Sequence, residues 1–169
     1  MANITAAAVN ELRKRTGVGM MDCKKALVEC DGDMDKAIDY LREKGQKLAA
    51  KRADRDASEG AVLATVNADK TFAAVIMMNC ETNKKTKNED FVAFTREVLQ
   101  TAVDAKAKSL EEVMALTING LSVETMIVEQ VAKIGEKITL SHYYPIEAVA
   151  TYAYVHPGNR MASVVGLSK

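Results

Sequence analysis

The stretch that decides the fold is residues 1–45, which read MANITAAAVNELRKRTGVGMMDCKKALVECDGDMDKAIDYLREKG. Its apolar residues recur at helical spacing in three successive groups: Val9 and Leu12, then Cys23, Ala26, Leu27 and Cys30, then Met34, Ala37, Ile38 and Leu41. Side chains are available to cap three helices at Thr5, Asp22 and Asp33, and glycines to end the first and third at Gly17 and Gly45. We therefore predict a bundle of three short helices. A bundle this small buries little surface, which favours a role in contacting another protein.

Composition changes along the rest of the chain. Residues 46–58 are charged and rich in alanine, which predicts an exposed helix that links two domains. Two apolar runs follow, at residues 61–66 and 72–78, with turn-forming residues 67–70 between them. This pattern predicts an antiparallel hairpin, and the second run lacks polar alternation, so we expect it to be buried on both faces.

The last part of the chain mixes helical and strand-like segments. The expected helices begin near Asn88 (with Phe91, Phe94, Val98 and Ala102 on one face), at Ser109 (with Glu112 in a capping box) and at Ser122 (ending at Gly135), and the expected strands cover residues 138–144, 148–155 and 161–167. Residues 157–159 are expected to form a turn. The whole chain is thus predicted to be an α+β protein, with a three-helix domain at 1–45, a linker at 46–58, and a domain at 59–169 that has an antiparallel sheet with helices on one face.

Charge and hydropathy exclude several classes of protein. The chain has 169 residues, with 23 Lys and Arg against 23 Asp and Glu, so its formal net charge is zero and direct nucleic-acid binding is not expected. No apolar run approaches the roughly 18 residues of a membrane-spanning helix, and the N-terminus lacks the pattern of a signal peptide. The three cysteines form no C-x-x-C pair and are interpreted as reduced thiols. Together these features predict a cytoplasmic protein that does not bind membranes.

The sequence contains no recognisable catalytic constellation. It has neither a G-x-x-x-x-G-K-[ST] loop for phosphates nor an H-E-x-x-H pair for zinc, and His142 and His156 are its only histidines. We predict no catalytic residue, no metal ion, no cofactor, and no nucleotide bound by the chain itself. Contact chemistry remains, and the loop at residues 17–21 is the first candidate. Its two methionines, Met20 and Met21, either fill the core of the small bundle or face a partner.

The amino-acid sequence of the predicted bundle resembles that of a known family. Residues 10–27, NELRKRTGVGMMDCKKAL, closely resemble the start of bacterial elongation factor Ts. Three further blocks agree: NCET at 79–82, VAKIGEKI at 131–138 and YVH at 154–156. The resemblance implies a guanine nucleotide exchange factor that binds elongation factor Tu and performs no covalent chemistry. Members of this family usually continue into a second, related half of the core, so residues 59–169 look like its first half.

The resemblance also implies contact residues. Arg13, Met20 and Met21 match positions that dock on the GTP-binding domain of elongation factor Tu. Ile134 and Gly135 match a second contact, although a glycine is also a common way to end a helix. His156 matches a third contact, although histidines in turns often have no role. These six residues are the expected partner-binding set: Arg13, Met20, Met21, Ile134, Gly135 and His156.

One family motif is altered. Relatives carry C-x-T-D-F-V-A, in which an aspartate and a phenylalanine form an apolar wedge, whereas residues 80–86 here read CETNKKT. Asn83, Lys84 and Lys85 thus replace the aspartate, the phenylalanine and the valine. Lysine is a flexible, hydrated cation and a poor wedge, so the resemblance implies a chain that docks but accelerates GDP release weakly. In the alternative, Lys84 repels the magnesium ion and exchange survives. Phe91 lies in a nearby DFVA string and is expected to be buried.

A different class of function remains open. The front bundle also looks like a ubiquitin-associated domain, which has three helices and a glycine-bearing loop after the first. Such a domain would be a non-catalytic binding module and would exchange nothing. A degenerate copy that binds the GTPase without acting on it is a third possibility.

Overall fold

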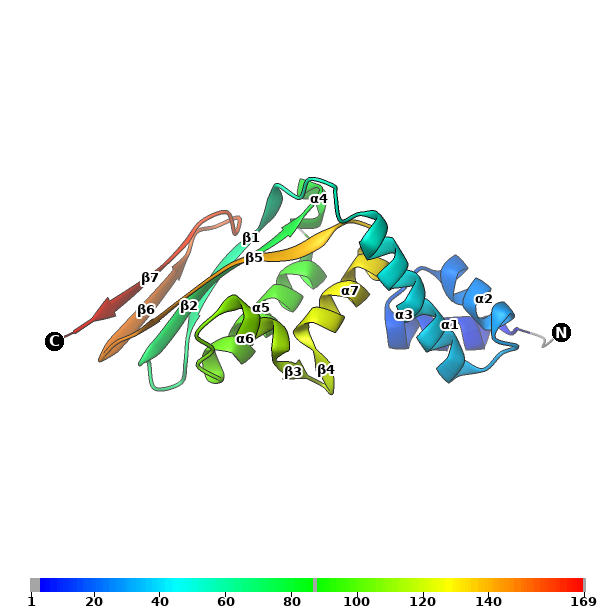
Figure 1. Ribbon diagram of the computed structural model, residues 1–169, viewed down its shortest axis with the longest axis horizontal. Helices are drawn as coiled ribbons and strands as arrows, with labels where there is room; N and C mark the ends of the chain where they lie inside the picture. Colours follow the sequence, from blue (N-terminus) through cyan, green and yellow to red (C-terminus); the bar gives the residue numbers. More distant parts are fainter. Residues whose placement is uncertain (1–3, 87, 169) are drawn as a thin grey trace. The chain divides into compact units, whose positions relative to one another are not determined.

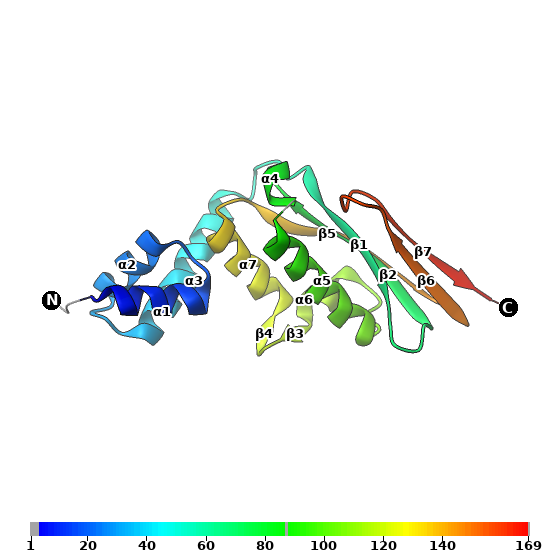
Figure 2. The ribbon, with the colours of Figure 1, turned by 180° about the vertical axis from the view of Figure 1, so that it is seen from behind.

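The computed structural model describes residues 4–86 and 88–168 and divides into two compact units. The first unit contains Met1–Asp54 and Ile127–Glu136, and the second contains Arg55–Met126 and Lys137–Lys169. The fold is of the α+β class. Three N-terminal helices are followed by antiparallel sheets and the helices packed on them (Figures 1 and 2). The predicted fold class is therefore confirmed.

The first unit is built from α1 (Ala6–Thr16), α2 (Met20–Glu29) and α3 (Met34–Lys51), joined by the later turns of α7 (Val123–Ile134). Its buried core consists of seven of the ten residues that the helical spacing selected, together with Val18 from the α1–α2 loop: Val9, Leu12, Val18, Cys23, Ala26, Leu27, Ala37 and Leu41. The other three, Cys30, Met34 and Ile38, are only partly buried against this core. Burial raises the pKa of the Cys23 thiol, as expected for a cysteine that packs as an apolar residue.

Two of the three predicted caps are present. The Thr5 hydroxyl accepts a hydrogen bond from the Ala8 amide at 3.2 Å. The Asp33 carboxylate accepts from the amides of Asp35 and Lys36, each at 3.1 Å, and the bond from Lys36 lowers the pKa of Asp33. These bonds satisfy amides that the helix itself leaves unpaired.

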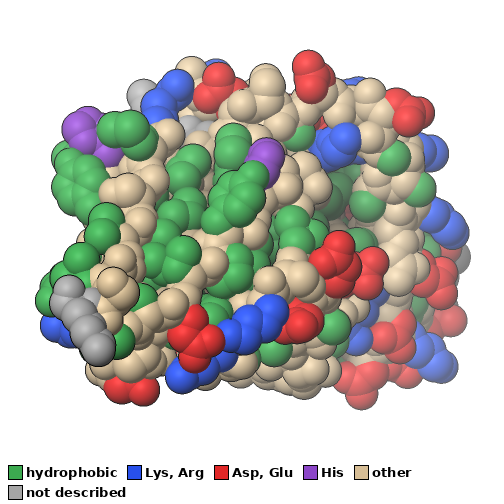
Figure 3. Space-filling model, turned by 60° about the vertical axis from the view of Figure 1, so that its left-hand side comes forward, with side chains coloured by type: hydrophobic (Ala, Val, Ile, Leu, Met, Phe, Trp, Pro, Cys, Tyr) green, Lys and Arg blue, Asp and Glu red, His purple; other side chains and the backbone are tan. Residues whose placement is uncertain are grey.

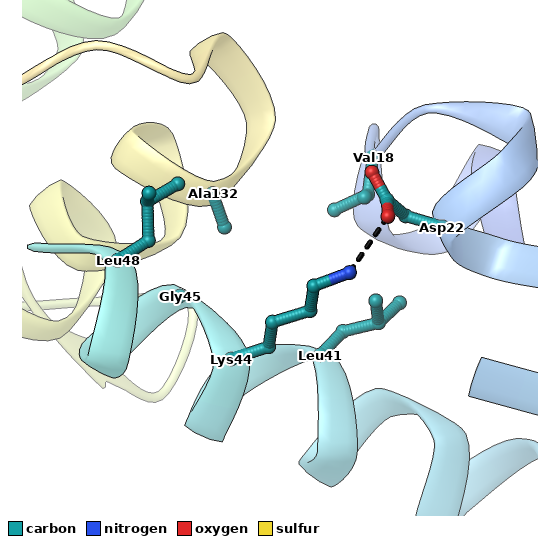
Figure 4. Close-up of a pocket in the computed structure, with 7 residues that line it drawn as sticks. All are labelled: Val18, Asp22, Leu41, Lys44, Gly45, Leu48 and Ala132. Carbon is teal, nitrogen blue, oxygen red and sulfur yellow. Dashed lines mark hydrogen bonds and ion pairs between the residues drawn. The ribbon is translucent and has the colours of Figure 1, made fainter. Parts of the chain in front are cut away.

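The predicted cap at Asp22 is wrong. The helix begins three residues earlier than predicted, at Met20, with Gly19 in the cap position and no side-chain cap. Asp22 lies in the first turn, and its carboxylate is 2.7 Å from the Lys44 ammonium of α3 (Figure 4). The positive end of the helix and this ion pair together explain an aspartate at this position.

The predicted helix end at Gly45 is also wrong, because α3 continues to Lys51. Gly45 is buried in the middle of the helix, where a Cβ atom would lie 2.9 Å from the Ala132 Cβ and 3.5 Å from the Val128 carbonyl oxygen of α7. Figure 4 shows Gly45 facing Ala132 beside a hollow of about 60 Å³. The glycine therefore permits close approach of two helices rather than a turn.

We predict that Gly45→Ala destabilises the first unit by about 1 kcal/mol, although alanine is normally the better helix former. The added methyl group would meet a methyl group that has no rotamer to move into. Urea unfolding of Gly45→Ala, Ala132→Gly and the double variant measures the coupling. The double variant should be more stable than the sum of the single changes predicts, and strict additivity would contradict the close contact.

The second unit is centred on an antiparallel sheet of β1 (Glu59–Val66), β2 (Phe72–Cys80) and β5 (Ile138–Glu147), in the order β1-β2-β5. The predicted hairpin of β1 and β2 is confirmed, with Val62 opposite Met77 and Ala64 opposite Val75. β2 is the central strand, and most of its residues are buried, as its continuous apolar run predicted. β5 is longer than predicted because its pairing with β2 extends to Glu147.

Helices of the second unit cover one face of this sheet. They are α4 (Asn83–Thr86), α5 (Glu89–Asp104) and α6 (Leu110–Ala115), and a short ribbon of β3 (Thr117–Ile118) and β4 (Leu121–Ser122) follows. The predicted cap of α6, Ser109, is confirmed, and α5 begins where expected, with the Asn88 side chain as its cap. The Glu112 carboxylate reaches back to the amide of Lys108 instead of Ser109, one residue beyond the predicted capping box. Burial raises the pKa of Tyr143 to about 12, and its phenol donates to the Ala107 carbonyl at 3.0 Å.

A two-stranded ribbon of β6 (Ala150–Val155) and β7 (Ala162–Leu167) covers the other side of the sheet, as Figures 1 and 2 show. Thr151 is fully buried, and its amide and hydroxyl both donate to the Lys70 carbonyl, at 2.7 Å and 2.9 Å. At the other end of the ribbon, the Val62 amide of β1 donates to the Asn159 carbonyl at 2.8 Å. The ribbon is thus fixed to the β1–β2 hairpin at both ends.

Candidate partner-binding surfaces

The α1–α2 loop and the end of α7 meet in the first unit, although they are far apart in the sequence. Gly17 has a φ angle of +68°, and its amide donates to the Arg13 carbonyl at 2.8 Å, which ends α1. A Cβ atom on Gly17 would lie 2.9 Å from the Lys133 Cε, so the last turn of α7 lies against this loop. The structure therefore brings the segment of Arg13, Met20 and Met21 next to the segment of Ile134 and Gly135.

Met20 and Met21 lie in the first turn of α2, rather than in the loop where the sequence analysis placed them. Their exposed fractions are 49% and 66%, so neither fills the core. Val18 takes that place: it is buried, and the Cys23 thiol donates to its carbonyl at 3.5 Å. Of the two interpretations of these methionines, only presentation to solvent agrees with the structure.

Exposed cations lie in the last turn of α1, just before the loop that leads to these methionines. Arg13 and Lys14 are exposed in the last turn of α1, and in the described part of the chain neither forms an ion pair. Arg15, in contrast, is paired with Glu11 at 2.9 Å. An apolar centre with unpaired cations at its rim is suited to a partner surface that has an apolar pocket and acidic flanks.

Ile134 ends α7, and Gly135 follows with a φ angle of +75°. The Gly135 amide donates to the Val131 carbonyl at 2.8 Å. No heavy atom lies within 4 Å of an added Cβ at Gly135, so its backbone angle explains the glycine and close packing does not. Ile134 is partly exposed beside it. A contact role for these two residues remains a prediction.

The altered motif forms α4, a single helical turn at the end of β2. Lys84 is exposed, whereas the side chain of Lys85 lies outside the described residues. Glu81, the second residue of the motif, is held in place by two contacts. Its carboxylate pairs with Arg55 at 3.1 Å and accepts a hydrogen bond from the Lys137 amide at 2.6 Å. Phe91 has an exposed fraction of 0% in α5, so its predicted burial is confirmed. It cannot be presented as a surface wedge.

His156 is exposed in the turn after β6, as predicted. Its amide donates to the Met161 carbonyl at 2.8 Å, and its Nδ1 atom is 2.9 Å from the Tyr154 hydroxyl. The residue lines a hollow of about 340 Å³ that runs between β1, α5 and the turn, with Arg96 on the opposite side. His156 therefore belongs to a shaped surface of the second unit.

One large surface was not predicted from the sequence, the outer face of the β6–β7 ribbon. The large apolar side chains on this face are about half exposed: Tyr152, Tyr154, Val165 and Leu167. Hydrophobic side chains gather over the ribbon in Figure 3, in which the side of the molecule that carries the C-terminus comes forward. Alternation along β6 and β7 could have revealed two faces. It could not reveal which face is exposed, because Val155 and Val164 on the inner face are also apolar.

Residues 4–86 and 88–168 contain neither a candidate membrane-spanning helix nor a candidate metal site. No helix in these ranges has the length and apolar character needed to cross a membrane. The same ranges hold no group of three or more His, Cys, Asp and Glu side chains that could bind a metal ion.

Comparison with known families decides the assignment. The family described as "Elongation factor TS" matches residues 81–169, which is just over half of the chain, and the family described as "Elongation factor Ts, mitochondrial, N-terminal" matches residues 1–49. The chain belongs to the elongation factor Ts family. The family resemblance seen in the sequence blocks is therefore confirmed.

Individual elongation factor Ts proteins agree along the whole chain. It is 52% identical to that of Christiangramia forsetii over 169 residues, which is 100% of this chain and 61% of the relative. It is 48% identical to that of Flavobacterium johnsoniae and 47% identical to that of Rhodopirellula baltica, over 99% and 98% of this chain and 52% and 50% of the relatives. The chain thus spans between one half and about three fifths of the length of these relatives.

Proposed function

We propose that the chain binds elongation factor Tu and promotes exchange of its guanine nucleotide, in the cytoplasm and without covalent chemistry. Membership of the elongation factor Ts family carries the proposal. Two features of the first unit support it: Met20 and Met21 are exposed, and they lie beside the Gly17 loop that contacts the end of α7. Arg13 and His156 are also exposed and Ile134 is partly exposed, so each of the three expected contacts has a side chain available to a partner.

The physics of exchange requires only differential binding. A translational GTPase holds GDP through backbone amides around the phosphates and through a magnesium ion, and release is slow because these contacts must all break. A factor that binds the nucleotide-free shape more tightly weakens the binding of GDP to the GTPase. GDP weakens the binding of the factor to the same extent. Such a factor needs neither a proton donor nor a nucleophile. It needs a firm docking surface and a group that disturbs the nucleotide site.

The altered motif sets the expected strength of exchange. Lys84 occupies the position of the family's phenylalanine and is exposed at the end of β2. Its ammonium group attracts the phosphates that an exchange factor must release, and it is too strongly hydrated to act as an apolar wedge. We therefore propose that docking is retained and that acceleration of GDP release is weak.

The test is a calorimetric titration of the chain into nucleotide-free and into GDP-bound elongation factor Tu. We expect clearly tighter binding to the nucleotide-free form. A variant with Met20→Ala and Met21→Ala should lower that affinity about tenfold or more, because large exposed side chains at the centre of an interface carry much of its binding energy.

Val28→Ala is the matched control, since Val28 is 54% exposed on the same helix, two turns from Met21. It should change the affinity much less. Equal affinity for the two forms of the GTPase would favour the alternative, a non-catalytic binding module of the ubiquitin-associated type. No binding to either form would refute the proposed function and leave the ubiquitin-associated module as the alternative.

A further inference from the structure

The outer edge of β1 has backbone groups that no strand pairs. In the described part of the chain β1 pairs only with β2, so it is an edge strand. The Val62 amide points away from β2, because it donates to Asn159. In an antiparallel pair, residues alternate between bonding to the neighbouring strand and pointing away from it. Ala64, two residues after Val62, therefore directs its N–H and C=O groups toward the open edge.

The turn after β6 covers this edge only at Val62 and leaves the edge at Ala64 open. Gly158 and Asn159 have φ angles of +91° and +55°, and the Asn159 amide donates to the His156 carbonyl at 3.0 Å, which holds the turn over Val62. The hollow of about 340 Å³ begins there and includes Ala64. Natural proteins usually cover exposed sheet edges, and here the cover ends beside a space that an extended chain could enter.

The walls of the hollow are ordered. Leu63 of β1 and Leu99 of α5 line it and are 3% and 1% exposed, so they belong to the packed core. The Thr65 hydroxyl is hydrogen-bonded to the Gln100 side chain at 3.3 Å, which ties β1 to α5 at this point. The edge of β1 and the facing side of α5 are thus held by the fold before any partner arrives.

Arg96 gives the hollow a positive charge. It is exposed on α5, and within residues 4–86 and 88–168 it forms no ion pair and no side-chain hydrogen bond. Two carboxylates line the adjoining groove of α5, Glu97 and Asp104; Asp104 accepts from the Gln100 side-chain amide at 2.9 Å, and in the described part of the chain neither forms an ion pair with Arg96. Arg96 therefore remains available to a carboxylate from outside, and a guanidinium binds a carboxylate with two parallel hydrogen bonds.

We propose that an extended segment of the partner GTPase adds to the outer edge of β1 at Ala64 and places an acidic side chain on Arg96. Main-chain bonds to an exposed strand give affinity in this mode of recognition, and side-chain contacts give specificity. The partner is favoured as the source because His156, which the family resemblance marks as a contact, lines the same hollow. This inference rests on the proposed function and extends the contact surface to β1 and α5.

The first test is residue-resolved hydrogen exchange of the chain, alone and with nucleotide-free elongation factor Tu. The Ala64 amide should exchange at least about tenfold more slowly in the complex, because it gains a hydrogen-bond acceptor. The Val62 amide is the internal control, since it is already bonded to Asn159 and should change little. An unchanged Ala64 amide in a complex that does form would overturn the inference.

The second test is the affinity of Arg96→Gln for nucleotide-free elongation factor Tu. Loss of a charge-assisted contact should weaken binding about five- to tenfold and reduce its dependence on salt. Lys70→Asn is the control: it also removes one exposed cation beside β1, and asparagine tolerates the positive φ of 56° at that position. Equal effects of the two substitutions would overturn the inference and leave the proposed function standing, whereas failure of the unmodified chain to bind would overturn both.

Discussion

Lys84→Phe is expected to accelerate GDP release from elongation factor Tu by roughly 10- to 100-fold relative to the unmodified chain. Burying a phenylalanine side chain contributes about 1.5–3 kcal/mol. If that burial occurs only while the nucleotide leaves, the whole contribution lowers the barrier to release. The position suits such a change, since Lys84 is exposed in α4, three residues after the anchored Glu81. Stopped-flow release of a fluorescent GDP gives the rate.

Lys84→Ala separates the two effects of this substitution, because it removes the charge without adding a wedge. If the ammonium group of Lys84 contributes nothing to exchange, GDP release from elongation factor Tu should be about as slow with Lys84→Ala as with the unmodified chain. If Lys84 drives exchange by repelling the magnesium ion, Lys84→Ala should be slower. Lys84→Phe and Lys84→Ala with equal rates would contradict the wedge explanation.

Local signals predicted the elements well, because helix caps and apolar spacing act within a few residues. Thr5 and Asp33 cap their helices as expected, and the β1–β2 hairpin follows its turn residues. The two errors in the bundle have a common cause. Asp22 and Gly45 were assigned from local patterns, whereas an ion pair with Lys44 and a contact with Ala132 determine their roles. Tertiary contacts between distant residues leave no local signal.

The same limit applies to the candidate partner-binding surfaces, which depend on contacts between separate elements. The sequence alone left the exposure of Met20 and Met21 open, because two glycines before a helix are compatible with either orientation. The hollow at the edge of β1 was beyond sequence reasoning, since Ala64, Arg96 and His156 come from three separate elements. The family resemblance supplied His156 as a single residue, and the structure supplies the surface around it.

Phe91→Ala is expected to destabilise the second unit by about 3–5 kcal/mol. Phe91 is completely buried in the first turns of α5, where the hydroxyl of the equally buried Thr95 donates to its carbonyl at 2.9 Å. Removing a large core side chain loses its transfer free energy and leaves a cavity. Denaturation followed by far-ultraviolet circular dichroism measures the loss. Lys84→Ala is the control and should shift the free energy of unfolding by less than about 0.5 kcal/mol.

Phe91→Leu distinguishes a core residue from a wedge that has moved along the DFVA string. Leucine keeps most of the apolar volume, so this variant should remain folded with a loss of about 1.5 kcal/mol or less. If Phe91 is only a core residue, folded Phe91→Leu should release GDP at the rate of the unmodified chain, whereas a displaced wedge would lose rate without losing structure. Faster GDP release is then expected from Lys84→Phe and not from changes at Phe91. Lys84 occupies the family's wedge position and is exposed, whereas Phe91 is buried.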